Sequence, residues 1–241
     1  MRNISFFTWS FVAVLICACY LISIIIVHPL VGIKLTPVSD GVCKVVELYP
    51  NGWAKYKNIR INDLVYCQKD KNDPVFKLEK VDEVVVYDGE KKYSKGISYY
   101  GMPFSFIFFS FIHILYFCIS FIIAIILYLK NKGNKQYRII SLIIVLISLG
   151  YLSGGVSARE DTFGVFITIL CMWLTPIVLI EYLNTMIPSD KKFKSTKFTY
   201  ILLILLAIIS LFFLQEVRVI FTFLLLIFVL IVFFVKKYKY I

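Results

Sequence analysis

The chain has 241 residues, of which 60% are hydrophobic and 17% are aromatic, and its formal net charge is +11. This apolar share exceeds what a soluble domain of the same length needs to fill its core, so the composition excludes an ordinary soluble globular protein. The positive charge does not indicate a nucleic-acid partner, because the basic residues of the short loops gather at the ends of apolar segments. The composition predicts a protein of the lipid bilayer.

Six apolar stretches are each long enough to cross a bilayer as a helix, which satisfies its own backbone hydrogen bonds in lipid. They cover residues 6–27, 103–129, 139–156, 163–187, 198–214 and 219–235. We therefore expect a polytopic α-helical membrane protein with six transmembrane helices. The expected parts are an N-terminal helix at 1–27, a polar domain at 28–102, and a five-helix bundle at 103–241 with a basic C-terminus.

The distribution of basic residues predicts the orientation. By the positive-inside rule, lysine and arginine in short loops mark the cytoplasmic side of a membrane. The residues that fall on one side are Arg2, Lys130, Lys132, Lys135, Arg138, Lys191, Lys192, Lys194, Lys197, Lys236, Lys237 and Lys239. Both termini are therefore predicted to be cytoplasmic in the plasma membrane, and residues 28–102 extracytoplasmic. The first stretch is too long for a usual signal core and lacks a small-x-small cleavage site, so we expect an uncleaved anchor.

In the polar domain, β-branched runs predict strands and Pro, Gly, Asn or Asp clusters predict turns. Asn58 and Asn62 are residues that tolerate left-handed backbone. Asp73-Pro74 predicts the start of a short helix, with an aspartate cap before proline at the first helical position. The predicted elements are a strand at 42–48, a turn at 50–52, a helical turn at 53–57, a strand at 64–68, a helix from 74 to about 80, and a hairpin of strands at 82–87 and 90–95.

The order of these pieces, with Trp53-Ala54, Asn58-Ile59 and Asn62 to Val65, resembles a PDZ domain of the bacterial, protease-associated kind. Both glycines of the usual PDZ pattern are asparagine here. The resemblance implies a small α/β domain that binds an extended peptide at a sheet edge, with the peptide carboxylate captured by Ser39, Asp40, Gly41 and Val42. Asp40 would repel a carboxylate, so a closed packing module without peptide remains the alternative.

A second resemblance extends over most of the chain. Tyr151 to Gly155, Thr175 to Ile187 and Lys237 to Tyr240 follow one span and an external PDZ-like domain. This arrangement resembles the sensor region of ComP-type quorum-sensing histidine kinases. The resemblance implies a receptor region that detects a peptide pheromone for a two-component signal transduction system. His28 and His113 are the only histidines, and neither is placed to act as a phosphoacceptor, so we expect no kinase activity from the chain as given.

No other catalytic motif indicates an enzyme, a metal or a cofactor. The sequence has no His-Glu-x-x-His, no Walker-type phosphate loop and no Cys-x-x-Cys. We therefore expect no catalytic residue, no metal ion and no cofactor. Cys43 and Cys67 are the cysteines of the polar domain, and they either form a disulfide or serve as small core residues.

Polar and small residues within the spans predict helix contacts. Glu181 is a carboxylate within the fourth span, where charge is costly. It either makes a helix contact with Asn184 or a neighbouring span, or reaches toward the headgroups. Gly150 and Gly154 have the Gly-x-x-x-Gly spacing of closely packed helices, and Pro176 predicts a kink.

Charged turns at the predicted outer side form the candidate ligand site. Arg159 and Glu160, with Tyr151 and Ser153, either rim a pocket beneath the PDZ-like domain or are solvated turn residues. A second turn carries Gln215, Glu216 and Arg218. We expect a receptor for a peptide pheromone-like signal, and the alternative is a non-catalytic scaffold whose domain holds an extracytoplasmic protein segment. The expected partners are the bilayer and that ligand, with a homodimer left open and no nucleic acid.

Overall fold

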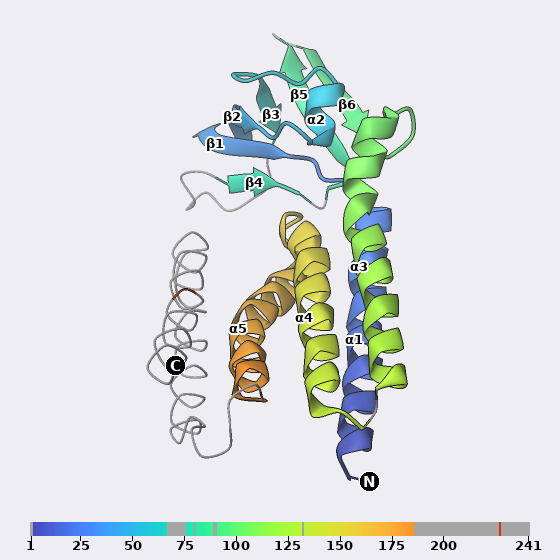
Figure 1. The fold of residues 1–241 in the computed structure, drawn as a ribbon. Coiled ribbons are helices and arrows are strands. Elements are labelled where there is room, and N and C mark those ends of the chain that lie inside the picture. Colours follow the sequence, from blue (N-terminus) through green and yellow to red (C-terminus); the bar gives the residue numbers. More distant parts are fainter. Residues whose placement is uncertain are drawn as a thin grey trace. The chain divides into compact units, whose positions relative to one another are not determined.

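A computed structural model describes residues 2–66, 76–79, 81–88, 91–131, 133–185 and 227. The chain divides into two compact units. The sheet unit holds Cys19–Leu115 and Gly154–Val165, and the helical unit holds Met1–Ala18, Tyr116–Ser153 and Phe166–Ile241. Figure 1 gives the order of the helices and strands along the chain.

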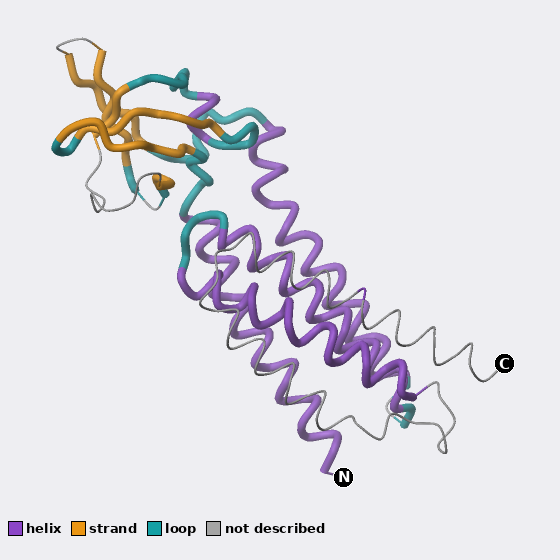
Figure 2. The backbone as a smooth tube through the Cα atoms, turned by 90° about the vertical axis from the view of Figure 1, so that its left-hand side faces the viewer, coloured by secondary structure: helices purple, strands orange, loops and turns teal. Residues whose placement is uncertain are grey.

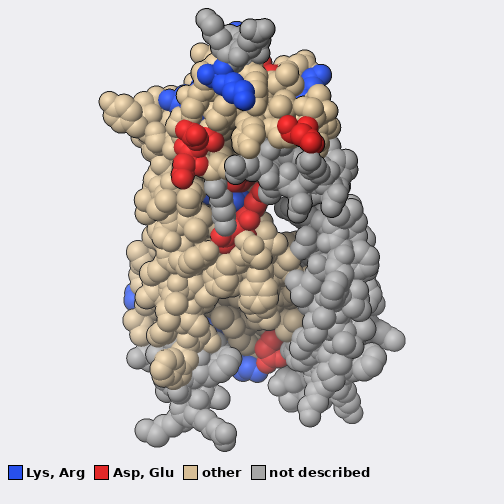
Figure 3. Space-filling view, turned by 180° about the vertical axis from the view of Figure 1, so that it is seen from behind, with Lys and Arg blue, Asp and Glu red and all other residues tan. Residues whose placement is uncertain are grey.

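Four long helices lie within the described residues, and each is long and apolar enough to cross a membrane. They are α1 (Arg2–Val27), α3 (Phe104–Lys130), α4 (Lys135–Ser157) and α5 (Thr162–Thr185). They confirm the helical character of the first four predicted spans. The predicted spans at 198–214 and 219–235 lie outside the described residues. On the face seen in Figure 3, charged side chains gather mainly over the sheet, and the helices present mainly uncharged side chains, as a lipid-facing surface requires.

Helix α4 begins four residues before the apolar stretch that predicted it. Asn134 explains this early start, because its side-chain oxygen accepts a hydrogen bond from the Gln136 N–H at 2.9 Å. Its carbonyl also accepts a bond from the Arg138 N–H. An asparagine cap satisfies backbone donors that the first turn of a helix leaves unpaired.

The strands form one antiparallel sheet with the order β4-β1-β2-β3-β5-β6 in the described part of the chain. Figure 2 shows these strands in orange. Their bounds are β1 Ile33–Ser39, β2 Val42–Leu48, β3 Leu64–Tyr66, β4 Phe76–Leu78, β5 Glu83–Asp88 and β6 Lys91–Gly96. The predicted strand at 42–48, the strand beginning at Leu64 and the hairpin of β5 and β6 are confirmed. The predicted helical turn is α2 (Trp53–Tyr56). Strand β1 was not predicted.

The helix predicted from residue 74 to about 80 is wrong where the structure describes it. Residues Phe76–Leu78 form strand β4, which pairs antiparallel with β1 through Ile33 and Leu78 and through Leu35 and Phe76. The buried side chain of Leu78 joins the core of the sheet unit. Pairing with β1 and this burial outweigh the local Asp73-Pro74 helix signal. The second short helix of the PDZ-like expectation is therefore absent from these residues.

The core of the sheet unit follows the period of two that a strand imposes on its side chains. Cys43 and Val45 alternate inward on β2 and meet Val65 of β3. Trp53, the first residue of α2, is fully buried in the same core. Phe106 joins this core from the first turn of α3. The sheet thus packs directly on Phe106 of α3, a helix long and apolar enough to cross a membrane.

Two asparagines hold the backbone conformation that the sequence predicts they tolerate. Asn58 has φ 56° and Asn62 has φ 79°, both in the left-handed region. The Arg60 N–H donates to an Asp63 side-chain oxygen at 2.9 Å, which closes the turn between them. Asparagine is, after glycine, among the residues most tolerant of this backbone region.

The linker, residues 28–32, connects α1 to β1 and is held by main-chain bonds. The Trp53 N–H donates to the Leu30 carbonyl at 2.8 Å, and the Tyr49 N–H donates to the Gly32 carbonyl at 2.9 Å. Gly32 has φ 73°, and a Cβ at this position would lie 2.7 Å from the Gly52 Cα. Only glycine fits such a backbone approach, so the path of the linker over α2 is fixed locally.

Candidate functional site

The side chain of Arg159 is bound in the turn between α4 and α5. It is 2% exposed, and its Nε donates to the His28 carbonyl at 2.6 Å. Its Nη1 donates to the carbonyl of Gly155. The interpretation of Arg159 as a solvated turn charge is therefore wrong, because the guanidinium is buried on two main-chain oxygens.

The way α4 ends explains this arrangement. The last carbonyls of a helix have no partner within it. Ala158, Arg159 and Glu160 donate their N–H groups to Gly154, Val156 and Ser157, respectively. None of these three main-chain bonds goes to the Gly155 carbonyl. That carbonyl accepts a hydrogen bond from the guanidinium of Arg159 instead. Glu160 then reverses the chain with φ 56°, in the left-handed conformation common after a helix end.

Asp161 begins the next helix. One of its side-chain oxygens accepts from the Gly164 N–H at 2.7 Å, and its carbonyl accepts from the Val165 N–H. This is the N-cap of α5. The other oxygen accepts from the Tyr20 hydroxyl of α1 at 3.0 Å, and Asp161 is 2% exposed. This role was not predicted, although an aspartate directly before an apolar helical run is a known start signal.

Glu79 is a buried carboxylate whose role was also not predicted. Its two side-chain oxygens accept hydrogen bonds from the consecutive N–H groups of Val31 at 2.9 Å and Gly32 at 2.8 Å. Burial raises the pKa of the Glu79 carboxyl from 4.5 to about 7. The two N–H bonds and the positive charge of Arg159 act in the opposite direction on this pKa, and the negative charge of Glu160 raises it. No sequence signal identifies Glu79.

These contacts converge on the linker and the end of α1. Glu79 binds the linker at Val31 and Gly32, and Arg159 binds it at His28. The Tyr99 hydroxyl, between β6 and α3, donates to the Ile25 carbonyl of α1 at 2.6 Å. We call these contacts, together with the Tyr20–Asp161 bond, the linker network. It lies within the sheet unit and ties α1, the sheet and the α4–α5 turn together.

Two predicted site residues take part in contacts of the helical unit. Ser153 is fully buried, donates to the Gly150 carbonyl at 3.0 Å and accepts from the Thr168 hydroxyl of α5 at 2.9 Å. Its hydroxyl thus serves the packing of α4 on α5. Tyr151 is 43% exposed and contacts the edge of Tyr116 on α3, with ring centroids 5.0 Å apart.

The stretch predicted to capture a peptide carboxylate forms the β1–β2 hairpin. Ser39 ends β1, Asp40 and Gly41 make the turn, and Val42 begins β2. Gly41 has φ 72°, and the Tyr66 ring lies against it. Peptide binding at this hairpin stays a prediction. The other predicted site residues, Gln215, Glu216 and Arg218, lie outside the described residues.

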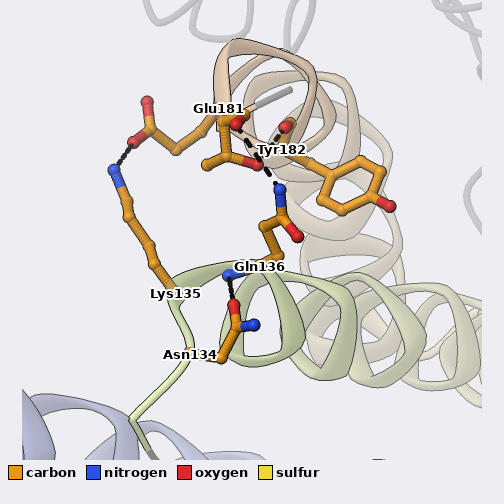
Figure 4. Close-up of polar contacts among 6 residues, drawn as sticks. Asn134, Lys135, Gln136, Glu181 and Tyr182 are labelled. Carbon is orange, nitrogen blue, oxygen red and sulfur yellow. Dashed lines mark hydrogen bonds and ion pairs between the residues drawn. The ribbon is translucent and has the colours of Figure 1, made fainter. Parts of the chain in front are cut away.

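Glu181 contacts the neighbouring helix α4 (Figure 4), although the contact is not buried, as a helix contact within the span was expected to be. Its carboxylate pairs with the Lys135 ammonium at the start of α4 at 2.5 Å, and the two side chains are 37% and 62% exposed. Gln136 Nε2 also donates to the Thr185 carbonyl. The Lys135–Glu181 ion pair is not buried, so its contribution to stability is of the order of 0–1 kcal/mol. The side chain of Asn184 lies outside the described part.

The small residues of α4 pack unequally. A Cβ at Gly150 would lie 3.2 Å from the Cys171 Cβ of α5, so Gly150 supports the predicted close packing. A Cβ at Gly154 would meet no described atom within 4 Å, whereas one at Gly155 would lie 3.0 Å from the His113 ring. Pro176 lies inside α5, as predicted, and the kink stays a prediction.

The described cysteines differ in oxidation state. Cys43 is disulfide-bonded, and Cys67, the second cysteine of the predicted pair, lies outside the described residues. Cys17, Cys19, Cys118 and Cys171 are free. Within the described ranges, no group of three His, Cys, Asp or Glu side chains is placed to hold a metal ion.

No known protein family, curated protein or solved structure matches this chain. The resemblances to PDZ domains and to ComP-type sensors therefore stay predictions from short motifs.

Proposed function

We propose that this chain is the sensor region of a membrane receptor, in which an extracytoplasmic domain detects a peptide-like signal and transmits it to membrane-spanning helices. The observation that carries this proposal is the bond from Arg159 to the His28 carbonyl. It connects the α4–α5 turn to the linker, through which the sheet is joined to α1. This buried link supplies a direct path by which a movement of the linker would reach the α4–α5 turn.

The orientation of the proposed receptor rests on two independent features. The basic short loops favour cytoplasmic termini by the positive-inside rule. The disulfide at Cys43 favours an oxidising compartment for the domain, because disulfides persist outside the cytosol. Both features support an extracytoplasmic location for residues 28–102.

In this proposal the linker network transmits the signal by switching between two arrangements, one with the Arg159 and Glu79 bonds as described and one with these bonds altered. A ligand shifts a conformational equilibrium only if it binds one state more tightly than the other. A peptide that contacts the domain and moves the linker would alter the Arg159 and Glu79 bonds, and with them the end of α1 and the α4–α5 turn. The helix packing would then report the ligand. The attached output, by the resemblance to ComP-type sensors, would be a histidine kinase.

A chimeric receptor tests this proposal. Residues 1–241 would replace the membrane sensor of a histidine kinase that drives a fluorescent reporter, and cells would be exposed to fractionated hydrophobic peptides. We expect a fraction that changes reporter output for the wild type and for Arg60→Met, but not for Arg159→Met at equal membrane abundance. Arg60 is an exposed arginine of the same sheet unit, so it controls for loss of charge.

Two results would overturn the proposal. Equal responses of Arg159→Met and the wild type would show that the bond to His28 transmits nothing. Absence of any response, combined with co-purification of an extracytoplasmic protein that is insensitive to Arg159→Met, would favour the scaffold.

A further inference from the structure

The buried side chain of Glu79 binds the main chain of the linker. It is 7% exposed, and each of its carboxyl oxygens accepts a hydrogen bond from one of two consecutive main-chain N–H groups, Val31 and Gly32. The carboxyl group thus fastens the segment that connects α1 to β1.

The charge of Glu79 has no ion-pair partner among the described residues. Its two donors are neutral N–H groups, and Arg159, a cation that lowers its pKa, is bonded to the carbonyls of His28 and Gly155. A buried carboxylate without a paired cation is costly, so the neutral form is favoured. A protonated carboxyl group keeps acceptor capacity on its oxygens, so both N–H groups retain an acceptor.

The other charged groups around this site come from each neighbouring element. Glu160, in the same turn as Arg159, acts on Glu79 with the opposite sign. On the flanking strands, Lys34 of β1 is paired with Glu47 at 2.6 Å, and Lys34 and Lys77 of β4 both lie over the Tyr49 ring. The linker itself contributes the titratable side chain of His28.

We propose that Glu79 is a proton-responsive latch, which holds Val31 and Gly32 while its buried carboxyl group is protonated and favours release of the linker when that group ionises. This inference goes beyond peptide detection, because it requires no ligand other than the proton. The latch acts on the same linker that Arg159 binds. A change in external pH would therefore bias the connection between the sheet and α1.

The direction follows from linkage. The pKa of Glu79 is about 7 in the closed state, against 4.5 for the hydrated group. A group whose pKa is higher in the closed state stabilises that state fully below pH 4.5, and the contribution is lost as pH rises through 7. A difference of this size changes the opening equilibrium by about two orders of magnitude between the two limits. Opening therefore becomes easier as pH rises.

Hydrogen–deuterium exchange of the full chain in lipid nanodiscs tests the latch. Exchange of peptides that cover residues 28–35 would be measured from pH 5 to pH 8.5 and corrected for the intrinsic pH dependence of amide exchange. We expect the opening equilibrium of the wild type to rise by a factor of about 10–100 over this range. Glu79→Gln, which stays neutral, should remove the rise.

Two control variants identify the titrating group. Glu47→Gln removes a glutamate whose side chain is 52% exposed on β2, and it should keep the wild-type pH dependence. His28→Gln removes the imidazole of the linker, and it should also keep it. A flat wild-type profile, or a slope that survives in Glu79→Gln, would overturn the latch.

If Glu79→Gln fails to fold, direct titration of the wild-type glutamates still tests whether Glu79 is the responsive group. Carboxyl groups of the wild type would be followed by ¹³C-glutamate NMR, and one should titrate near pH 7. Titration of every glutamate below pH 5 would refute the inference. Neither measurement uses a peptide, so failure of the latch leaves the receptor proposal to be judged by the chimera alone.

Discussion

Replacement of Arg159 by methionine should destabilise the fold markedly. The guanidinium makes two hydrogen bonds to main-chain carbonyls, those of His28 and Gly155, while being 2% exposed. Methionine preserves most of the apolar stem of the side chain but offers no donor. The change therefore isolates the polar contacts of Arg159 from its packing.

The expected loss can be worked from these two bonds. A hydrogen bond from a charged donor contributes about 1.5–3 kcal/mol, and a buried carbonyl left unpaired loses a comparable amount. Removing a buried charge returns part of this free energy, because the guanidinium no longer has to be desolvated. We expect the free energy of unfolding to fall by about 2–4 kcal/mol. For a chain of this length that is a drop of about 5–15 °C in Tm.

Thermal unfolding of the purified chain in detergent, followed by circular dichroism, measures this loss. Arg60→Met makes the same chemical change at an exposed position of the sheet unit and should stay within about 0.5 kcal/mol of the wild type. Arg159→Lys should fall between them, because one ammonium cannot reproduce the planar fork of donors. If Arg159→Met unfolds with the wild type and Arg60→Met, the two carbonyl bonds do not stabilise the fold and the reasoning is refuted.

Three further predictions concern the same turn and the sheet. Glu160→Gly should have a free energy of unfolding about 1 kcal/mol higher than Glu160→Ala in the same thermal assay, since residue 160 holds φ 56°; the reverse order would contradict the left-handed conformation. Asp161→Ala should lower it by about 1–2 kcal/mol through loss of the α5 cap, whereas Asp161→Asn, which still caps, should lose less; equal losses would argue against capping. Peptide mapping without reduction should recover Cys43 cross-linked to Cys67, because the other four cysteines are free; a free Cys43 thiol would contradict the disulfide.

The helices and most strands were predictable because their signals are local. A run of apolar residues long enough to span lipid identifies α1, α3, α4 and α5 without reference to any neighbour. The alternation in β2 and the hairpin of β5 and β6 are likewise carried by short windows of sequence. The tolerance of asparagine for positive φ also held at Asn58 and Asn62. Each of these features depends on the residue itself or on its nearest neighbours.

Strand β4 shows where local signals fail. Asp73-Pro74 favours a helix start, yet Phe76–Leu78 pair with β1, about 40 residues earlier in the chain. The free energy of that pairing and of burying Leu78 depends on a partner that no short window contains. The expectation of a second helix, and with it part of the resemblance to PDZ domains, was lost for this reason.

The sequence alone determined that this chain is apolar enough for the bilayer, where its four described long helices begin and end to within a few residues, and that charged residues cluster in the turn at Arg159 to Asp161. Only the tertiary structure decided what those charges do. Arg159 binds a carbonyl 131 residues away, and Glu79 binds an N–H 48 residues away. Whether a charged side chain is solvated or buried against a main-chain partner depends on which distant segments the fold brings beside it. Composition and periodicity describe only short stretches of sequence, so they cannot predict those segments.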